Sequence, residues 1–205
     1  MSVQTFFNPL GTNKGAPYPV GTVLFESGTA GTYSVNVYEG IYELQICGAG
    51  GGGGGSAGSH AWYGQNGGTG AAWKGQIKLS YGTYTLNIGQ GGNGGAGSGR
   101  NALPGGNGTE SNISLSGNRL ITTGAGNGGA GTGNYSGANN GAGGTLTIGS
   151  LNIINTSISS NGITQSTTSI LGNGYGAGGA IRGGTSGLNG TNGYIKLSYI
   201  RLRPN

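Results

Sequence analysis

The chain has little charge and few of the side chains that carry out chemistry. Of its 205 residues only 6% are charged; there is no aspartate, and there are four glutamates, one histidine and one cysteine. A single cysteine, Cys47, excludes an intrachain disulfide, and we expect it to be a small buried apolar group. One histidine without aspartate excludes a metal cluster and a catalytic triad. The glutamates show no evident carboxylate pair, so we expect no metal, no cofactor and no enzymatic activity.

The basic residues are too few and too scattered for a nucleic-acid groove. The net charge is +5 and the pI about 9.4, but only Arg201 and Arg203 lie close together. A groove for nucleic acid would gather charge on one face, with aromatic residues. No apolar run is long enough to cross a membrane, and residues 1–9 lack the features of a signal peptide. We expect a protein made in the cytoplasm, without nucleic-acid binding or membrane insertion, that is used elsewhere after lysis or within a particle.

Glycine is what the chain has in excess, with 53 glycines and only five prolines. Such a composition without a strict period is typical of low-complexity or disordered chains. Disordered chains, however, are usually rich in charge, and this one has eleven tyrosines and several alternating apolar stretches. Glycine costs about 1 kcal/mol in a helix interior, so we expect almost no α-helix.

The apolar residues alternate in several short stretches, which is the pattern of half-buried β-strands. Residues 32–46 predict a hairpin with one apolar side, turning at Glu39-Gly40. The same pattern returns at 76–88, with a turn at Gly82-Thr83. The pentapeptide Ile-Lys-Leu-Ser-Tyr occurs at 77–81 and again at 195–199. We expect the two copies to do the same job in one small antiparallel sheet; chance similarity between strand-like pentapeptides is the alternative.

The strand that ends at Cys47 runs directly into Gly48–Gly55, and other glycines recur every third residue, as in Gly187, Gly190 and Gly193. A three-residue period matches a left-handed extended helix with three residues per turn. This helix has no internal hydrogen bonds, so its backbone groups must bond to neighbouring helices. The pattern predicts an all-β fold in which a bundle of polyglycine-II helices lies beside a small antiparallel sheet. Broken triplets and scarce proline disfavour collagen; flexible silk-like repeats remain the alternative.

Composition divides the chain into several parts. We expect residues 1–22 to be an extended N-terminal arm, 23–200 to be the glycine-rich domain and 201–205 to be a basic tail. Residues 145–171 form a Ser/Thr/Ile-rich insert. We expect this insert to be one or two strands, or a protruding hairpin with a turn at 160–162, that serves binding or subunit contact.

Less regular segments interrupt the glycine blocks, at 59–66, 100–104, 134–136 and 173–175. If glycine helices run side by side, these segments become the tips that join them. Aromatic and amide side chains on a rigid scaffold suit binding to carbohydrate or protein. The candidate receptor-binding residues are His60, Trp62, Tyr63, Gln65, Arg100, Asn101, Tyr135, Asn139 and Tyr175. The alternative is that residues such as Trp62 and Tyr63 only cover the end of the bundle.

Three regions resemble the glycine-rich domains of phage tail fibres and tail-tip adhesins. These are Tyr42–Gly55, Ala71–Gly92 and the closing Gly193–Tyr199, so that the resemblance covers about residues 22–200. It implies a polyglycine-II sandwich beside a small sheet, and receptor binding through hypervariable tip loops. Those loops would map onto 59–66, 100–104 and 134–140. The chain departs from the resemblance in its 145–171 segment and in being short for a complete fibre.

The resemblance implies a virion surface protein, on a phage tail fibre or tail tip, that binds a host surface protein or glycan. It would be made in the host cytoplasm and located on the virion, or otherwise be extracellular. Its partners would include other virion or fibre subunits, as a homo-oligomer or docked on a larger fibre. One alternative is a structural subunit without receptor binding, with strands such as 194–200 pairing between subunits. An ice-binding protein is another, but it would need a regular Thr or Ala face that the sequence does not show.

Overall fold

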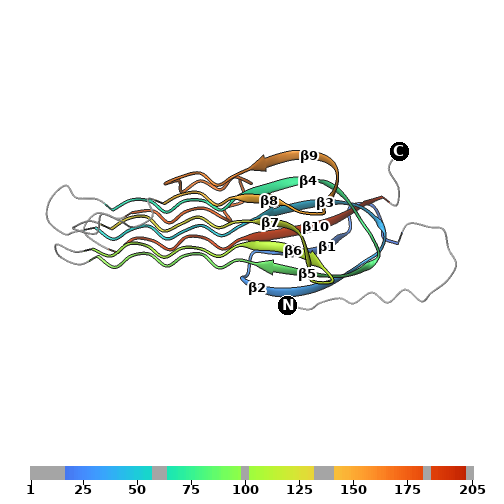
Figure 1. Cartoon of the computed structure of the whole chain (residues 1–205), viewed down its shortest axis with the longest axis horizontal. Helices are drawn as coiled ribbons and strands as arrows, with labels where there is room; N and C mark the ends of the chain where they lie inside the picture. Colours follow the sequence, from blue (N-terminus) through green and yellow to red (C-terminus); the bar gives the residue numbers. More distant parts are fainter. Residues whose placement is uncertain (1–16, 57–63, 98–101, 132–140, 182–185, 202–205) are drawn as a thin grey trace.

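The computed structural model describes residues 17–56, 64–97, 102–131, 141–181 and 186–201. These residues form two five-stranded antiparallel sheets, packed face to face in one half of the molecule. The other half is a bundle of extended segments that continue from the ends of the strands (Figure 1). No α-helix occurs in the described residues, which confirms the all-β fold class.

The two sheets interleave along the sequence, as their strand orders show. Sheet A has the order β1-β10-β3-β4-β9, and its strands are β1 (Val23–Ser27), β10 (Tyr194–Arg201), β3 (Gly40–Cys47), β4 (Ala72–Leu79) and β9 (Asn152–Ser160). Sheet B has the order β2-β5-β6-β7-β8, and its strands are β2 (Gly31–Val37), β5 (Gly82–Ile88), β6 (Ser111–Leu115), β7 (Asn118–Thr123) and β8 (Leu146–Ile148).

The hydrophobic core lies between the sheets and follows the predicted alternation. On β3, Tyr42, Leu44 and Ile46 are fully buried, whereas Glu43 and Gln45 are only partly covered. Burying each such aliphatic side chain contributes roughly 1.5–3 kcal/mol. Cys47 is 2% exposed at the end of the strand, and burial raises the pKa of its thiol to about 12. The prediction of a small buried group at Cys47 is confirmed.

The two predicted hairpins are not formed, because each pair of strands is divided between the sheets. β2 pairs with β5 in sheet B, while β3 pairs with β4 and β10 in sheet A. The short links at 38–39 and 80–81 therefore carry the chain from one sheet to the other, and the predicted turn residues Gly40 and Gly82 are the first residues of β3 and β5. Alternation fixes which face of a strand is buried but not which strand is its partner.

Both copies of the repeated pentapeptide contribute residues to sheet A, in the strands on either side of β3. Ile77 of β4 and Tyr199 of β10 both lie opposite Tyr42. Because β10 is bonded to β1 on its other edge, both of its edges are occupied. The suggestion that residues 194–200 pair between subunits is therefore wrong.

Residues 145–171 do not form a protruding hairpin. β8 is the edge of sheet B and β9 the edge of sheet A, so this segment completes both sheets. The chain does not reverse at 160–162 either. The Gly162 N–H donates to the carbonyl of Gly144, and the chain continues from there along the bundle. The β-branched residues predicted the strands here, but nothing in the pattern shows that they belong to different sheets.

The segment after β3, residues 48–55, lies at the centre of the bundle. Its N–H groups donate to three neighbouring segments in strict rotation. Gly48, Gly51 and Gly54 donate to segment 64–71, Ala49, Gly52 and Gly55 to segment 102–109, and Gly50 and Gly53 to segment 188–191. Since every third residue faces the same neighbour, the segment has the three-residue turn of a polyglycine-II helix.

Three other segments donate hydrogen bonds to this central segment, through Gly92 and Gly95, Gly126 and Gly129, and Gly179. Neighbours therefore surround it on all sides. A Cβ atom at any position from Gly50 to Gly55 would lie 1.9–2.4 Å from a backbone atom of a neighbour. This explains why the glycine run is unbroken here. In the outer segment 89–97 every third residue is exposed, which explains the looser triplet pattern.

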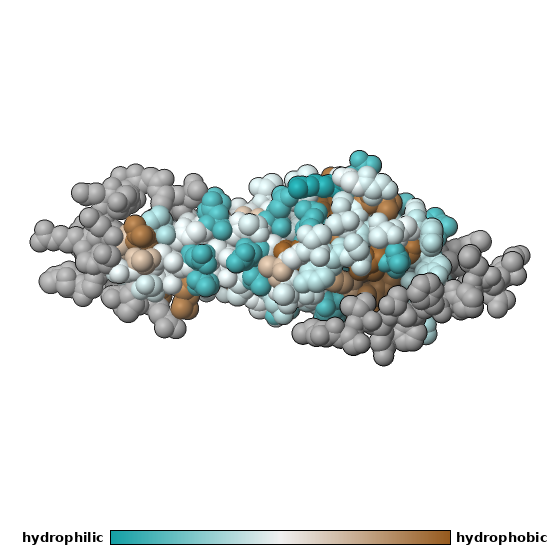
Figure 2. All heavy atoms as spheres, turned by 90° about the horizontal axis from the view of Figure 1, so that it is seen from below, coloured by the Kyte–Doolittle hydropathy of each residue, from teal (hydrophilic) through white to brown (hydrophobic). Residues whose placement is uncertain are grey.

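Side chains at the outward positions complete the hydrogen bonding of the outer segments. The side-chain oxygens of Ser186, Asn189 and Asn192 accept hydrogen bonds at 3.2, 2.8 and 3.0 Å. Their donors are the N–H groups of Gly97, Gly94 and Gly91, which are also three residues apart. The side chains thus take the place of a further neighbouring backbone. Figure 2 shows hydrophilic residues at intervals along the side of the bundle.

We expect alanine to destabilise the fold at an inward position of a segment and to leave its stability nearly unchanged at the adjacent outward position. A Cβ atom at Gly92 would lie 2.0 Å from the Gly106 carbonyl oxygen, whereas Asn93 is exposed. Gly92→Ala should lower the free energy of unfolding by about 3 kcal/mol or prevent folding, because a backbone atom has no rotamer by which to move away. Asn93→Ala should change it by less than about 0.5 kcal/mol. Urea denaturation measures both, and equal stabilities would contradict the packing.

Candidate binding surface

The bundle ends far from the sheets at a surface built from segments distant in sequence. Close to this end, the Gly54 N–H bonds to the Gln65 carbonyl at 2.8 Å, and the Gly55 N–H to the Leu103 carbonyl at 2.9 Å. At the same level, the Leu188 N–H bonds to the Ala180 carbonyl at 2.8 Å. We call this the distal end. The residues that flank four internal stretches of the chain lie at this end. The stretches themselves are outside the described residues and are 57–63, 98–101, 132–140 and 182–185.

Most of the predicted receptor-binding residues belong to these stretches and lie outside the described residues. They are His60, Trp62, Tyr63, Arg100, Asn101, Tyr135 and Asn139. What the structure adds is the position of the residues on either side of them. Since each stretch begins and ends at the distal end, the chain returns there repeatedly.

Gln65 lies in the bundle, beside the stretch 57–63. Its N–H donates to the Ala130 carbonyl at 2.7 Å, and its own carbonyl accepts from Gly54. The side-chain oxygen is buried and has no hydrogen-bond partner among the described residues. Gln65 therefore ties the central segment to an outer one through its backbone.

Tyr175 does not lie at the distal end, and the tip predicted at 173–175 is in the wrong place. Its ring stacks on that of Tyr194 in β10, with centroids 5.0 Å apart and the planes at 15°. After β9 the chain runs only part of the way along the bundle and then turns back. Gln165, with φ of +50°, lies in this turn. Gly172 and Gly174, with φ of +73° and +84°, permit a second turn at the junction, after which the chain runs out along the bundle again.

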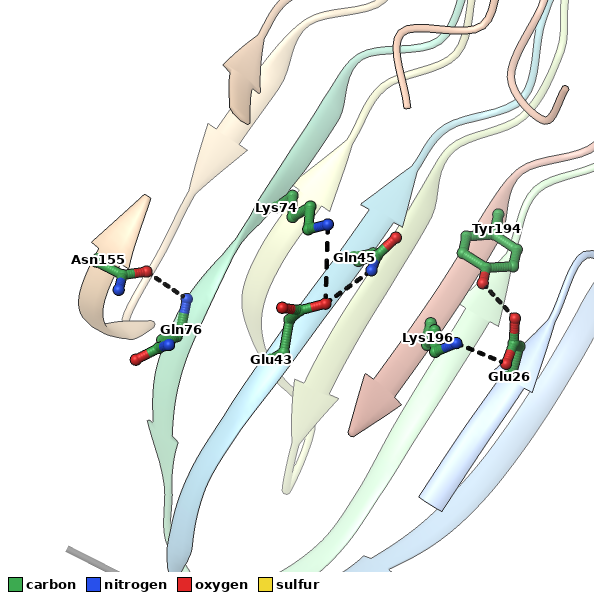
Figure 3. A network of polar contacts seen from close by, with 8 residues as sticks. All are labelled: Glu26, Glu43, Gln45, Lys74, Gln76, Asn155, Tyr194 and Lys196. Carbon is green, nitrogen blue, oxygen red and sulfur yellow. Dashed lines mark hydrogen bonds and ion pairs between the residues drawn. The ribbon is translucent and has the colours of Figure 1, made fainter. Parts of the chain in front are cut away.

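Tyr175 and Tyr194 line a shallow hollow at the junction of the sheets and the bundle, together with Glu26 and its neighbours Ser27 to Thr29, and Asn173. Figure 3 shows the polar contacts beside it. The Tyr194 hydroxyl donates to Glu26 Oε1 at 2.6 Å, and Lys196 Nζ lies 3.0 Å from Glu26 Oε2. Both contacts hold the pKa of Glu26 below its usual value, while burial and the nearby carboxylate raise the pKa of Tyr194. Sequence reasoning missed this pair, because 168 residues separate its members.

A family model described as a glycine-rich domain covers residues 27–200. The chain belongs to this glycine-rich domain family. No curated protein was found to match the chain.

In this glycine-rich domain, the described residues contain no cluster of three or more histidine, cysteine or acidic side chains that could hold a metal ion. They also contain no helix of the length and apolar character needed to cross a membrane.

The acidic residues of the glycine-rich domain are all paired, on its strands or directly beside them. Each glutamate has a basic partner: Glu26 with Lys196, Glu39 with Lys78, Glu43 with Lys74, and Glu110 with Arg119. Of nine basic residues, four are used in this way, which leaves the five that give the net charge of +5. These are Lys14, Arg100, Arg182, Arg201 and Arg203, of which only Arg201 is among the described residues. Arg100 and Arg182 belong to stretches bounded by the distal end.

We expect Tyr194→Phe to raise the pKa of Glu26, because the Tyr194 hydrogen bond is the largest single cause of its lowering. Since the folded pKa is lowered, these contacts stabilise the fold above the ordinary carboxyl pKa, and the stabilisation is lost on acidification. NMR titration of the carboxyl measures the pKa. Lys78→Met is the matched control, because Lys78 pairs with Glu39. An unchanged Glu26 pKa in the Tyr194 variant would contradict the assignment.

Proposed function

We propose that this glycine-rich domain is a virion surface protein, on a phage tail fibre or tail tip, that binds a host-cell receptor through the stretches that the distal end bounds. The observation that carries the proposal is the return of the chain to one end of a hydrogen-bonded scaffold. The bonds of this scaffold run between backbone groups of the glycine-rich segments. The stretches can therefore change in sequence without changing the bonds beneath them, which suits a surface that adapts to new receptors.

The residues of the stretches indicate the chemistry of the receptor. They include His60, Trp62, Tyr63 and Tyr135, together with several asparagines. Aromatic rings and amides are well suited to the faces and hydroxyls of sugars. The stretches also include Arg100 and Arg182 and no acidic residue. Because arginine binds carboxylate and phosphate in a bidentate manner, we propose a surface glycan with anionic groups, or a surface protein that carries such groups.

We expect the purified protein to bind host cells and to compete with phage adsorption. Trp62→Ala and Tyr135→Ala should weaken competition, because each removes an aromatic ring from a stretch whose flanking residues lie at the distal end. Tyr81→Ala is the matched control, since Tyr81 is 75% exposed and follows β4 at the opposite end of the molecule. The measurement is the fraction of phage left unadsorbed at increasing protein concentration. Absence of both cell binding and competition would overturn the proposal, and so would a coding sequence far from any virion genes.

A second candidate is a structural subunit that assembles through sheet edges, and β2 favours it. Its register with β5 is continuous from Gly31 to Val37, and it carries no charge. The other edges are protected in the usual ways. Pairing is irregular in β1 and β9, and β8 is only three residues long. Among the described residues, no strand pairs with the other edge of β2.

This second candidate predicts oligomers in sedimentation velocity experiments. Ser34→Lys, at an exposed position of β2, should shift them to monomers because a charge at a sheet edge opposes pairing. Ser157→Lys, on the irregular edge strand β9, is the control and should leave the oligomers unchanged. A monomer at every concentration would exclude assembly through β2.

A further inference from the structure

Asparagine followed by glycine is the dipeptide most open to spontaneous loss of ammonia, because glycine has no side chain to hinder attack. The glycine nitrogen gives its proton to solvent base and forms a bond to Cγ of the asparagine. The bond from Cγ to the side-chain nitrogen breaks, and that nitrogen takes up a proton from solvent and leaves as ammonia. Water then opens the five-membered succinimide to aspartate or isoaspartate. The reaction needs only water, and any such pair whose glycine nitrogen is free is open to it.

The bundle protects most of its Asn-Gly pairs by holding the glycine nitrogen. Eight pairs have a glycine N–H that donates a hydrogen bond of 2.7–3.1 Å. The glycines are Gly67, Gly94, Gly108, Gly128, Gly141, Gly162, Gly190 and Gly193. A nitrogen held in this way keeps its proton and is not free to move toward the asparagine side chain.

Asn173-Gly174 is the exception. Both residues are exposed, and the Gly174 N–H donates to no residue that the structure describes. The Asn173 side-chain oxygen accepts hydrogen bonds from Ser169 Oγ and from the Tyr175 N–H, both at 3.2 Å. These bonds draw electron density from Cγ, which makes it more open to attack. We propose that Asn173 is a site of spontaneous deamidation.

The product would change the hollow at the junction. Asn173 and Glu26 line the same hollow, so deamidation adds a second carboxylate to it. Isoaspartate would also lengthen the backbone just before Tyr175, whose ring stacks on Tyr194. The inference does not depend on receptor binding, because it concerns only the backbone and side chains of the loop.

Peptide mass spectrometry of the folded protein, incubated in mildly alkaline buffer, tests the proposal. We expect the peptide with Asn173 to gain the mass of an NH-to-O exchange about tenfold faster than peptides with Asn189 or Asn192. That factor corresponds to one hydrogen bond of roughly 1.4 kcal/mol. In denaturant all the Asn-Gly pairs should react at similar rates. Equal rates for Asn173 and Asn189 in the folded protein would overturn the proposal, and Asn173→Gln should abolish the signal at that peptide alone.

A pair of variants tests the mechanism of protection. Asn189→Ala removes the acceptor of the Gly94 N–H and should open Asn93-Gly94 to deamidation. Asn192→Ala removes the acceptor of the Gly91 N–H, which follows Gln90, and should create no new site. The Asn66 peptide in each variant reports whether the bundle stays folded. If Asn93 reacts equally in both variants while Asn66 stays intact, hydrogen bonding is not what protects the pairs.

Discussion

The structure depends on the close approach of one backbone to another along Gly50–Gly55. At these positions a neighbouring backbone occupies the space that a Cβ atom would need. Glycine loses more conformational freedom on folding than any other residue, so the run is unfavourable by itself. Hydrogen bonds to neighbours on all sides offset this loss, and they form only if every neighbour is in register. One buried glycine run thus fixes the spacing of the segments around it.

The sheets supply that register. Cys47 lies opposite Ala72 in the pairing of β3 with β4, and the next bond along runs from the Gly48 N–H to the Ala71 carbonyl. The hydrogen bonding of the sheet therefore continues into the bundle without a break. It then extends in further directions, because a three-residue turn points successive N–H groups at different neighbours. The apolar core between the sheets stabilises the strands, and the strands align the glycine segments.

Local periodicity predicted the local structure, and the rest depended on long-range contacts. Alternation at 32–46 predicted the strands, and the triplets of 187–193 predicted a three-residue turn. The partner of each strand could not be predicted, because alternation is the same whichever sheet a strand joins. Tyr175 looked like a tip residue because it interrupts a glycine block, yet its ring packs on Tyr194 at the other end of the bundle. The signal for the central segment was its unbroken glycine run, because the outer segments keep a side chain at every third position.

The direction of the hydrogen bonds determines how the bundle resists mechanical force. Bonds between adjacent segments lie across the long axis of the molecule, along which the segments run. A force applied at the distal end along this axis loads them in shear, so many must break together before a segment slides. A force across the axis would instead peel them apart one at a time. The same chain is thus strong along its length and weak across it.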